Sequence, residues 1–316
     1  MMNEAALVNE TVFVAGGSGF IGRGIVERLL DAGKKVTIIS RKPRRHPIPE
    51  RGNLEIVEGS ILDGNALRGA MAGCDAVVNA IGIIREKKLG GITFERLHID
   101  ATRNLLDEAE REGIRRFVQI SALGVRPDGV SRYQTTKLAA EEEIKRRIPC
   151  WTIFRPSLVI GPGAGFVSVI RPLARLPLTP VFGDGRYSFE PVDRRVVAEA
   201  VTRALVDENT CGVTYELRGP KVYTYDEILD ETARALGKRR ARKIHLPLWL
   251  MRPLVSATGW LPFAPVSRDQ LEMLLESGPA TGLDGVVELG LPVIDLPEAL
   301  AHAVAGEEIN DPQSPV

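Results

Sequence analysis

The feature that most constrains this chain is a run of glycines between a hydrophobic segment and an amphipathic one near the N-terminus. Residues 11–15 are mostly β-branched and aromatic, residues 16–22 read Gly-Gly-Ser-Gly-Phe-Ile-Gly, and residues 23–30 carry apolar side chains at helical spacing. This order predicts a strand, a tight turn and a helix. The spacing fits both G-x-G-x-x-G and G-x-x-G-x-x-G, so it does not choose between the two variants of this turn.

Each glycine has a separate predicted role, because a strand that reverses into a helix needs backbone angles and close approaches that a Cβ would block. Gly16 forms the turn, Gly19 leaves room for a phosphate, and Gly22 lets helix and strand touch. The N–H groups at the start of the helix attract an anion, which a glycine turn without a ligand would not need. The predicted pyrophosphate site comprises Gly16, Gly17, Ser18, Gly19, Phe20, Ile21 and Gly22.

Strand and helix patterns alternate along the first half of the chain. Residues 35–39, 54–58, 75–79, 116–121 and 151–156 predict buried strands, and residues 64–71, 93–112 and 132–147 predict helices. Such alternation implies right-handed crossovers and a doubly wound parallel sheet. We therefore predict an α/β protein with a Rossmann sheet and a smaller mixed C-terminal lobe.

The sequence pattern changes after residue 160, where prolines, glycines and scattered apolar residues replace the alternation of strand and helix patterns. A chain of 316 residues is long enough for about two domains. We predict a nucleotide-binding domain over residues 9–160, to which residues 189–218 return. A substrate or partner lobe covers residues 161–188 and 219–304, and a disordered tail covers residues 305–316.

Composition excludes several classes of protein. The chain has 41 Lys and Arg residues and 41 Asp and Glu residues, so it lacks the excess of positive charge that is typical of nucleic-acid-binding proteins. Cys74, Cys150 and Cys211 are far apart, which predicts buried thiols in a reducing compartment. The four histidines lack metal-ligand spacing, so no metal site is predicted. No signal sequence or long apolar run occurs, which predicts a cytoplasmic protein.

The residue after the second predicted strand bears on the choice of cofactor. An acidic side chain there accepts the ribose hydroxyls of NAD, whereas an arginine suits the 2′-phosphate of NADP. Arg41 stands at this place, and no Asp or Glu occurs over residues 36–49. The sequence favours NADP(H) over NAD(H), although a solvated basic loop over residues 41–45 is the alternative.

Further cofactor contacts are expected where parallel strands end. Ligands collect at the carboxyl edge of such sheets, and Asn79, Ala80 and Gly82 follow the fourth predicted strand. Asp63 follows the third strand and has two interpretations, as the N-cap of the next helix or as a contact to adenine.

A tyrosine and a lysine one helical turn apart indicate proton chemistry. Tyr133 and Lys137 lie on one face of the helix predicted over residues 132–147. The ammonium group would lower the pKa of the phenol and bind ribose hydroxyls. Ser121, at the end of the fifth strand, would hydrogen-bond a substrate carbonyl. The alternative is that Y-x-x-x-K arises by chance on a charged helix.

In this order, the glycine turn, Asp63, Asn79-Ala80-x-Gly82, Ser121 and Tyr133-x-x-x-Lys137 resemble the extended or atypical branch of the short-chain dehydrogenase/reductase superfamily. Residues 154–157, which include Pro156, resemble its sixth-strand exit. Residues 120–124, 131–133 and 261–270 are similar to the NAD(P)H-binding accessory subunit of respiratory complex I and its bacterial relatives. The resemblance implies tight binding of NADPH, a catalytic role for Ser121, Tyr133 and Lys137, and a cofactor contact at Pro156.

Three functions remain open. The first is an NADP(H)-dependent oxidoreductase acting on a hydrophobic carbonyl, quinone- or isoprenoid-related, with Phe166, Val169, Ile170, Leu173 and Leu176 lining the pocket. The second is a non-catalytic NADPH-binding subunit whose C-terminal lobe contacts a membrane or a respiratory complex, for which the apolar residues 244–255 are the motivation. The third is a nucleotide-sugar epimerase or dehydratase, which would favour NAD and an acid at residue 40 or 41.

Overall fold

The computed structural model describes residues 10–41, 48, 51–87, 90–129, 131–249, 271, 274 and 278–309. The chain forms two compact units, each assembled from three pieces of sequence. The first unit consists of Met1–Pro156, Arg195–Leu217 and Gly282–Leu291, and the second of Ser157–Arg194, Arg218–Thr281 and Pro292–Val316.

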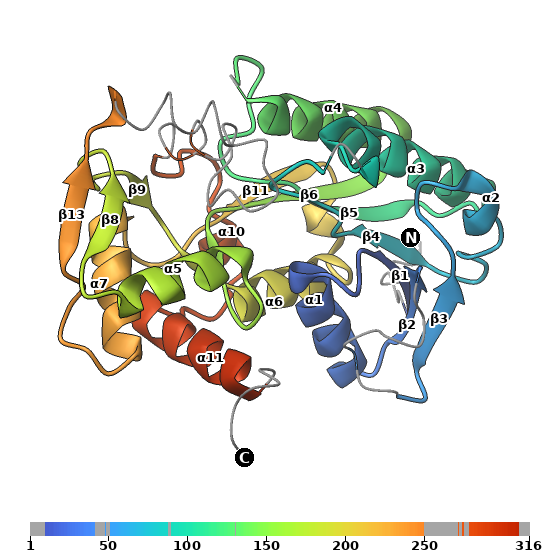
Figure 1. The fold of residues 1–316 in the computed structure, drawn as a ribbon. Helices are drawn as coiled ribbons and strands as arrows, with labels where there is room; N and C mark the ends of the chain where they lie inside the picture. Colours follow the sequence, from blue (N-terminus) through green and yellow to red (C-terminus); the bar gives the residue numbers. More distant parts are fainter. Residues whose placement is uncertain are drawn as a thin grey trace. The chain divides into compact units, whose positions relative to one another are not determined.

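A parallel sheet of seven strands forms the first unit (Figure 1). In spatial order its strands are β11 (Val213–Leu217), β6 (Cys150–Pro156), β5 (Arg116–Ile120), β4 (Ala76–Asn79), β1 (Thr11–Ala15), β2 (Lys35–Ser40) and β3 (Leu54–Glu58). Every residue of β4 and β5 is buried, as expected for strands covered on both faces. The order confirms the predicted Rossmann sheet, and the direction of winding reverses between β1 and β4.

Helices cover both faces of this sheet. Figure 1 shows α3 (Ala101–Arg111) and α4 (Arg132–Arg147) on one face, and α1 (Phe20–Asp31) and α6 (Arg194–Ala204) on the other. Shorter helical segments of this unit are α2 (Gly64–Leu67), the π-helix η3 (Glu95–Asp100), the 3-10 helix η4 (Glu208–Thr210) and α10 (Gly285–Glu288). The apolar faces of α3 and α4 meet the sheet in one core cluster that includes Phe13, Leu105, Phe117 and Ile144.

Two helices of the first unit differ from the sequence prediction. The helix predicted over residues 64–71 ends at Leu67, because Arg68 is extended and Gly69 has a positive φ of 79°. The first half of the helix predicted over residues 93–112 is a π-helix. The N–H of Ala101 bonds the carbonyl of Arg96, five residues back. Over so few residues, apolar spacing does not separate a π-helix from an α-helix.

The prediction of three reduced cysteines is wrong for two of them. Cys150 and Cys211 form a disulfide, and their Cα atoms lie 4.6 Å apart. The pairing arises because β6 and β11 are neighbours, so that the N–H of Gly212 donates to the carbonyl of Trp151. The two cysteines are 61 residues apart in sequence, so the sequence alone does not show that they are close in space. Cys74 is a buried free thiol, as predicted.

A buried arginine, Arg116, forms hydrogen bonds at the end of the sheet where the disulfide lies. Arg116 on β5 donates to the hydroxyls of Thr152 and Thr210 and to the carbonyls of Cys150 and Ala204. Burial lowers the pKa of Arg116 to about 10, so the guanidinium stays charged at neutral pH. These bonds join β5, β6, α6 and η4 around one cation.

The second unit is smaller and mixed, as predicted. Its helices are α5 (Gly165–Arg175), α7 (Tyr225–Ala235) and α11 (Leu296–Ile309), and α7 packs against both α5 and α11. Three two-stranded pairs accompany them: β7 (Val159–Ile160) with β10 (Val192–Asp193), β9 (Ser188–Phe189) with β12 (Tyr223–Thr224), and β8 (Thr179–Phe182) with β13 (Lys243–Leu246).

The end of the chain also departs from the prediction. A disordered tail was expected from residue 305, but α11 continues to Ile309. Residues 261–270, which carry part of the family resemblance, lie outside the described residues, as do residues 250–255 of the apolar stretch.

Candidate functional site

The glycine turn has the tight geometry that its sequence predicts. Gly16 has a φ of 76°, and its carbonyl accepts a hydrogen bond of 2.9 Å from the N–H of Gly19. A Cβ on Gly22 would overlap the carbonyl oxygen of Gly16, and a Cβ on Gly17 would lie 2.6 Å from Ile38 Cγ2. The close approach at Gly22 is therefore to the turn, not to the strand as predicted. Gly19 is the N-cap of α1 and offers no side chain to the first-turn N–H groups.

The turn lies against the end of β4, where the winding of the sheet reverses. Ala15 and Asn79 are paired across β1 and β4, and the N–H of Ala80 donates to the carbonyl of Ala15. The Asn79 side chain donates to Thr102 Oγ1 at 3.1 Å and accepts from the N–H of Ile81 at 3.1 Å. Asn79 thus shapes the loop beside the glycines, which is the place where open parallel sheets bind ligands.

Three other predicted cofactor residues lie at or after the ends of strands. Asp63 is the N-cap of α2 and accepts from the N–H groups of Asn65 and Ala66, which confirms the capping interpretation. Its contact to adenine stays a prediction. Arg41 is exposed and follows the last residue of β2. Pro156 ends β6, and its carbonyl accepts from the N–H of Leu123.

Helix α4 places Tyr133 and Lys137 on its buried face. Ser131 caps the helix reciprocally with Gln134, which fixes where the helix begins. The ammonium group of Lys137 donates to the carbonyls of Ile81 at 3.1 Å and Ile120 at 3.0 Å. Lys137 therefore lies between the ends of β4 and β5, and a Cβ on Gly82 would lie 3.2 Å from its Nζ.

Tyr133 packs against two aromatic rings, Phe94 and His98, which stack on each other. The rings of Phe94 and His98 meet it edge-on, with centroids 5.8 Å and 5.4 Å away. Burial raises the pKa of Tyr133 to about 12, so the phenol is protonated at neutral pH. Its hydroxyl has no hydrogen-bond partner among the residues that the structure describes. An unpaired donor of this kind is suited to a ligand.

Burial lowers the pKa of Lys137 to about 8, against the opposing charge of Glu141. Because the pKa is 10.5 in the unfolded chain, the unfolded chain binds more protons between these two values. The free energy of unfolding should rise by about 3 kcal/mol between pH 8 and 10.5, and Lys137→Met should lack this increase. Urea unfolding at several pH values measures the difference. Parallel pH profiles for the two proteins would contradict it.

Ser121 belongs to a buried charged cluster that the sequence analysis missed. Its hydroxyl donates to Glu141 Oε1 at 2.5 Å, and Glu141 is fully buried. Arg155 holds the same carboxylate through two hydrogen bonds, of 3.0 Å and 2.6 Å. Contact between Ser121 and a substrate carbonyl stays a prediction, and it would require this hydroxyl to leave Glu141. The position of Glu141, one turn after Lys137, is a signal that could have revealed the cluster.

His98 is a second residue that the sequence analysis missed. Its Nε2 lies 3.4 Å from the N–H of Ile83, which donates to it, and its Nδ1 lies 2.9 Å from Thr136 Oγ1. This pattern places the ring hydrogen on Nδ1. Burial, reinforced by the charge of Lys137, lowers the pKa of His98 to about 2, so the ring is neutral. His98 thus positions the loop after β4 beside Tyr133.

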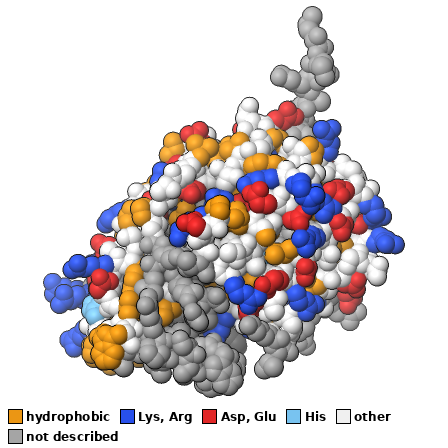
Figure 2. Space-filling model, turned by 90° about the horizontal axis from the view of Figure 1, so that it is seen from above, with side chains coloured by type: hydrophobic (Ala, Val, Ile, Leu, Met, Phe, Trp, Pro, Cys, Tyr) orange, Lys and Arg blue, Asp and Glu red, His pale blue; other side chains and the backbone are white. Residues whose placement is uncertain are grey.

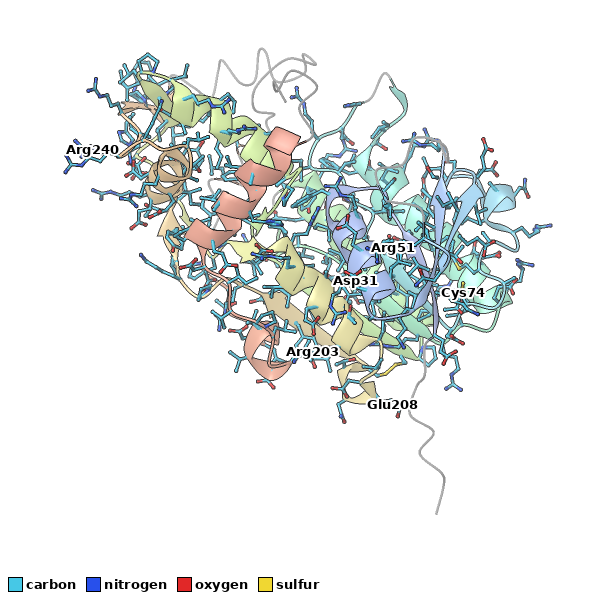
Figure 3. The ribbon with its side chains drawn as sticks, turned by 90° about the horizontal axis from the view of Figure 1, so that it is seen from below. Asp31, Arg51, Cys74, Arg203, Glu208 and Arg240 are labelled. Atoms are coloured by element: carbon cyan, nitrogen blue, oxygen red, sulfur yellow. A yellow bond between two sulfur atoms is a disulfide. The ribbon has the colours of Figure 1, made fainter. Side chains whose placement is uncertain are left out.

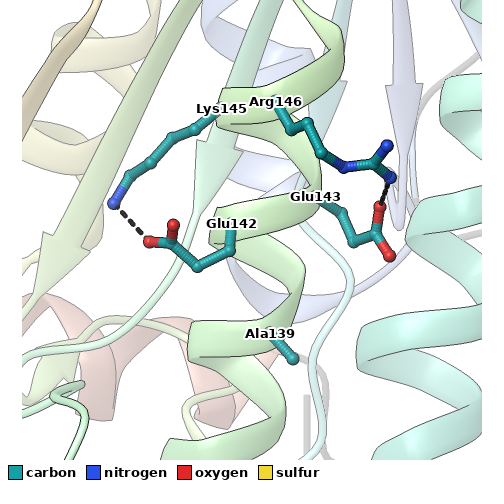
Figure 4. Close-up of a pocket in the computed structure, with 5 residues that line it drawn as sticks. All are labelled: Ala139, Glu142, Glu143, Lys145 and Arg146. Atoms are coloured by element: carbon teal, nitrogen blue, oxygen red, sulfur yellow. Dashed lines mark hydrogen bonds and ion pairs between the residues drawn. The ribbon is translucent and has the colours of Figure 1, made fainter.

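A separate hollow lies on the outer face of α4 and differs from this site (Figure 4). It is lined by Ala139, Glu142, Glu143, Lys145 and Arg146, which pair as Lys145 with Glu142 at 2.8 Å and Arg146 with Glu143. Ion pairs one turn apart on an exposed helix face contribute little and offer no nucleophile. We assign no function to this hollow.

The described part of the chain contains no group of three or more His, Cys, Asp or Glu side chains arranged to bind a metal ion. Within the same residues, no helix has the length and apolar character needed to cross a membrane.

The model of a protein family described as NAD(P)H-binding matches residues 16–208. A mitochondrial NADH-ubiquinone oxidoreductase 40 kDa subunit of Neurospora crassa is 28% identical over 277 residues, which cover 85% of this chain and 72% of the relative. The mitochondrial NADH dehydrogenase [ubiquinone] 1 alpha subcomplex subunit 9 of Arabidopsis thaliana is 32% identical over 234 residues and 70% of this chain. The chain spans only 56% of that plant relative.

A ceramide reductase of Caulobacter vibrioides is 27% identical over 241 residues, which cover 75% of this chain and 73% of the relative. Among solved structures, MoeE5 in complex with UDP-glucose and NAD matches with a TM-score of 0.71 and 20% identity, covering 95% of this chain and 99% of that one. At this identity, the structural likeness shows a shared fold.

Proposed function

This chain belongs to the NAD(P)H-binding family, as an atypical member of the short-chain dehydrogenase/reductase superfamily, and we propose that it reduces the carbonyl group of a hydrophobic small molecule with NADPH. The observation that carries the proposal is the pair of Tyr133 and Lys137. A protonated phenol with an unused hydroxyl lies one helical turn from a lysine, which is held at the same sheet edge as the glycine turn. The glycine turn fits a dinucleotide cofactor, and Tyr133 fits a general acid that protonates the substrate beside it.

In this proposal the cofactor supplies the hydride, and the residues of this chain bind and protonate. Gly16 to Gly22 hold the pyrophosphate, and Lys137 binds the ribose of the nicotinamide half. Tyr133 donates its phenolic proton to the carbonyl oxygen as charge develops on it. Ser121 and Glu141 keep the end of β5 in place. With a pKa of about 12, the phenol of Tyr133 carries its proton at neutral pH and is a weaker acid than a free tyrosine.

The direct test measures NADPH consumption by the purified protein with two probes, decylubiquinone and a long-chain ketone. Absorbance of the reduced nicotinamide should fall with at least one probe, and a short-chain ketone should be a poorer substrate. Mass spectrometry of nucleotide released by denaturation should detect NADP(H). A protein that holds NADPH and consumes none with any carbonyl would overturn the proposed reaction and leave the cofactor site intact.

The preference for NADP(H) is proposed to rest on Arg41, which would pair with the 2′-phosphate. Arg41→Ser should weaken NADPH binding about tenfold or more, since a hydrogen bond to a charged group contributes about 1.5–3 kcal/mol. NADH binding should change little. Arg68→Ser is the matched control, because Arg68 is also exposed. Fluorescence titration with both nucleotides measures the effect, and equal losses for NADPH and NADH would show that Arg41 does not select the phosphate.

The proposed hydrophobic substrate is supported by the relative named ceramide reductase.

The second candidate is an NADPH-binding subunit of a respiratory membrane complex. It is favoured by the hydrogen bond that holds the Ser121 hydroxyl on Glu141 and by the relatives named as NADH-ubiquinone oxidoreductase subunits. Retention of NADPH without consumption, together with co-purification of respiratory subunits, would support it. A nucleotide-sugar epimerase or dehydratase is the third candidate and rests on fold alone. Conversion of UDP-glucose with NAD would support that candidate.

A further inference from the structure

Positive charge is unevenly distributed in a chain whose net charge is zero. Residues 171–182 and 237–249 contain seven Lys or Arg side chains and no Asp or Glu. The two segments adjoin in the second unit, because β8 and β13 are paired and the N–H of Thr179 donates to the carbonyl of Arg242 at 2.6 Å. Lys238 strengthens the contact by donating to the carbonyls of Ala174 and Arg175.

The strand β13 uses its two faces differently. Lys243 and His245 point toward α7, where they contact Asp230 at 2.8 Å and Asp226 at 3.0 Å. Since side chains alternate along a strand, Ile244 lies on the opposite face, and Arg242 immediately precedes the strand. The acidic residues of α7 thus contact only one face of β13.

Three arginines beside this strand have no counter-ion among the described residues. The guanidinium groups of Arg239, Arg240 and Arg242 are exposed and form no ion pair or hydrogen bond with any described residue. The side chain of Arg240 points away from the ribbon (Figure 3). Figure 2 shows Lys and Arg side chains gathered at the end of the molecule where β13 lies, with hydrophobic side chains beside them.

The neighbouring apolar side chains are exposed to an unusual degree. Leu176 is 43% exposed, Leu178 is 50% and Ile244 is 44%. Leu176 and Leu178 lie in the turn that leads into β8, next to the segment that carries the arginines. Large apolar groups gathered at one surface indicate a contact with something other than water.

We propose that Leu176, Leu178, Arg239, Arg240 and Arg242 form a surface that binds an anionic phospholipid bilayer. Arginines that have no partner among the described residues match the negative charge of the headgroups, and the two leucines insert at the level between headgroup and acyl chain. A polyanion such as nucleic acid would use the arginines and leave the leucines in water. The proposal rests on the second unit alone and is independent of the cofactor chemistry proposed for the first.

Flotation of the full-length protein with vesicles tests the proposal. The protein should bind vesicles of phosphatidylcholine mixed with phosphatidylglycerol, should bind phosphatidylcholine alone far less, and should dissociate as salt is added. A variant with Arg239→Gln, Arg240→Gln and Arg242→Gln should lose affinity for the anionic vesicles by about a hundredfold. The matched control replaces three exposed cations of the first unit, as Lys35→Gln, Arg68→Gln and Arg115→Gln, and should bind as the wild type does.

A Leu176→Ser and Leu178→Ser variant separates a bilayer from a polyanion. Its affinity for the anionic vesicles should also fall, whereas its retention on heparin should match that of the wild type. Absence of vesicle binding, equal binding by both triple variants, or full binding by the leucine variant would each overturn the proposal. NADPH titration of every variant checks folding. Loss of vesicle binding with normal NADPH affinity leaves the proposed function untouched.

Discussion

Tyr133→Phe is expected to lower the rate of NADPH oxidation by a factor of about 10²–10⁴ and to leave NADPH affinity nearly unchanged. The substitution removes a hydroxyl that has no partner among the described residues, so it breaks no internal hydrogen bond. The ring contacts with Phe94 and His98 persist. The change therefore isolates the proton donor, and steady-state kinetics at saturating NADPH measure it.

The matched control is Tyr215→Phe. Tyr215 is also buried in the first unit, and burial raises its pKa as well, but it stacks on Phe154. This variant should keep the wild-type rate. Equal rates for wild type and Tyr133→Phe would remove Tyr133 as the acid and favour the non-catalytic subunit.

The raised pKa of Tyr133 gives the proposed reaction a different expected pH dependence in each direction. Its pKa of about 12 keeps the phenol protonated, which reduction of a carbonyl requires. Oxidation of an alcohol requires the phenolate, which is scarce below that pH. We expect carbonyl reduction to change little between pH 6 and pH 8 and alcohol oxidation to rise steadily over the same range. Initial rates in both directions test this expectation.

Glu141→Leu is expected to lower the free energy of unfolding by about 3–5 kcal/mol. Glu141 is fully buried and accepts hydrogen bonds from Ser121 and from both arms of Arg155. Its loss leaves the Arg155 guanidinium, which is 19% exposed, without the carboxylate that it hydrogen-bonds. Urea unfolding followed by tryptophan fluorescence measures the change.

Two further variants define the origin of that loss. Glu142→Gln, one residue along the same helix, removes a carboxylate that is 60% exposed and should cost less than about 1 kcal/mol. The double variant Glu141→Leu with Arg155→Leu should recover much of the stability, because it removes both charges. A double variant as unstable as Glu141→Leu would show that packing, and not the unpaired arginine, accounts for the loss.

Much of the first unit could be predicted because its signals are local. The glycine turn between strand and helix needs backbone angles and close contacts that side chains exclude, and these appear directly in the sequence. The alternation of strands and helices specified the parallel sheet for the same reason. Tyr133 and Lys137 share a helix, so their common face followed from their spacing.

The features that the sequence did not reveal depend on tertiary contacts. Cys150 and Cys211 meet because two strands pair, and Arg155 reaches Glu141 from β6. Tyr133 was expected to have a lowered pKa beside Lys137. In the structure that ammonium group donates to two carbonyls, and burial raises the pKa of the phenol instead. Spacing along the chain cannot show which of these effects is larger.

The division of each unit into three pieces of sequence bears on how the protein is made. The last piece of the first unit, Gly282–Leu291, packs α10 against β11, where the N–H of Glu216 donates to the carbonyl of Leu283. Because synthesis runs from the N-terminus, residues 213–217 of β11 are made about 65 residues before the segment that covers them. Until that segment has been made, the edge of β11 is open to pairing with another strand.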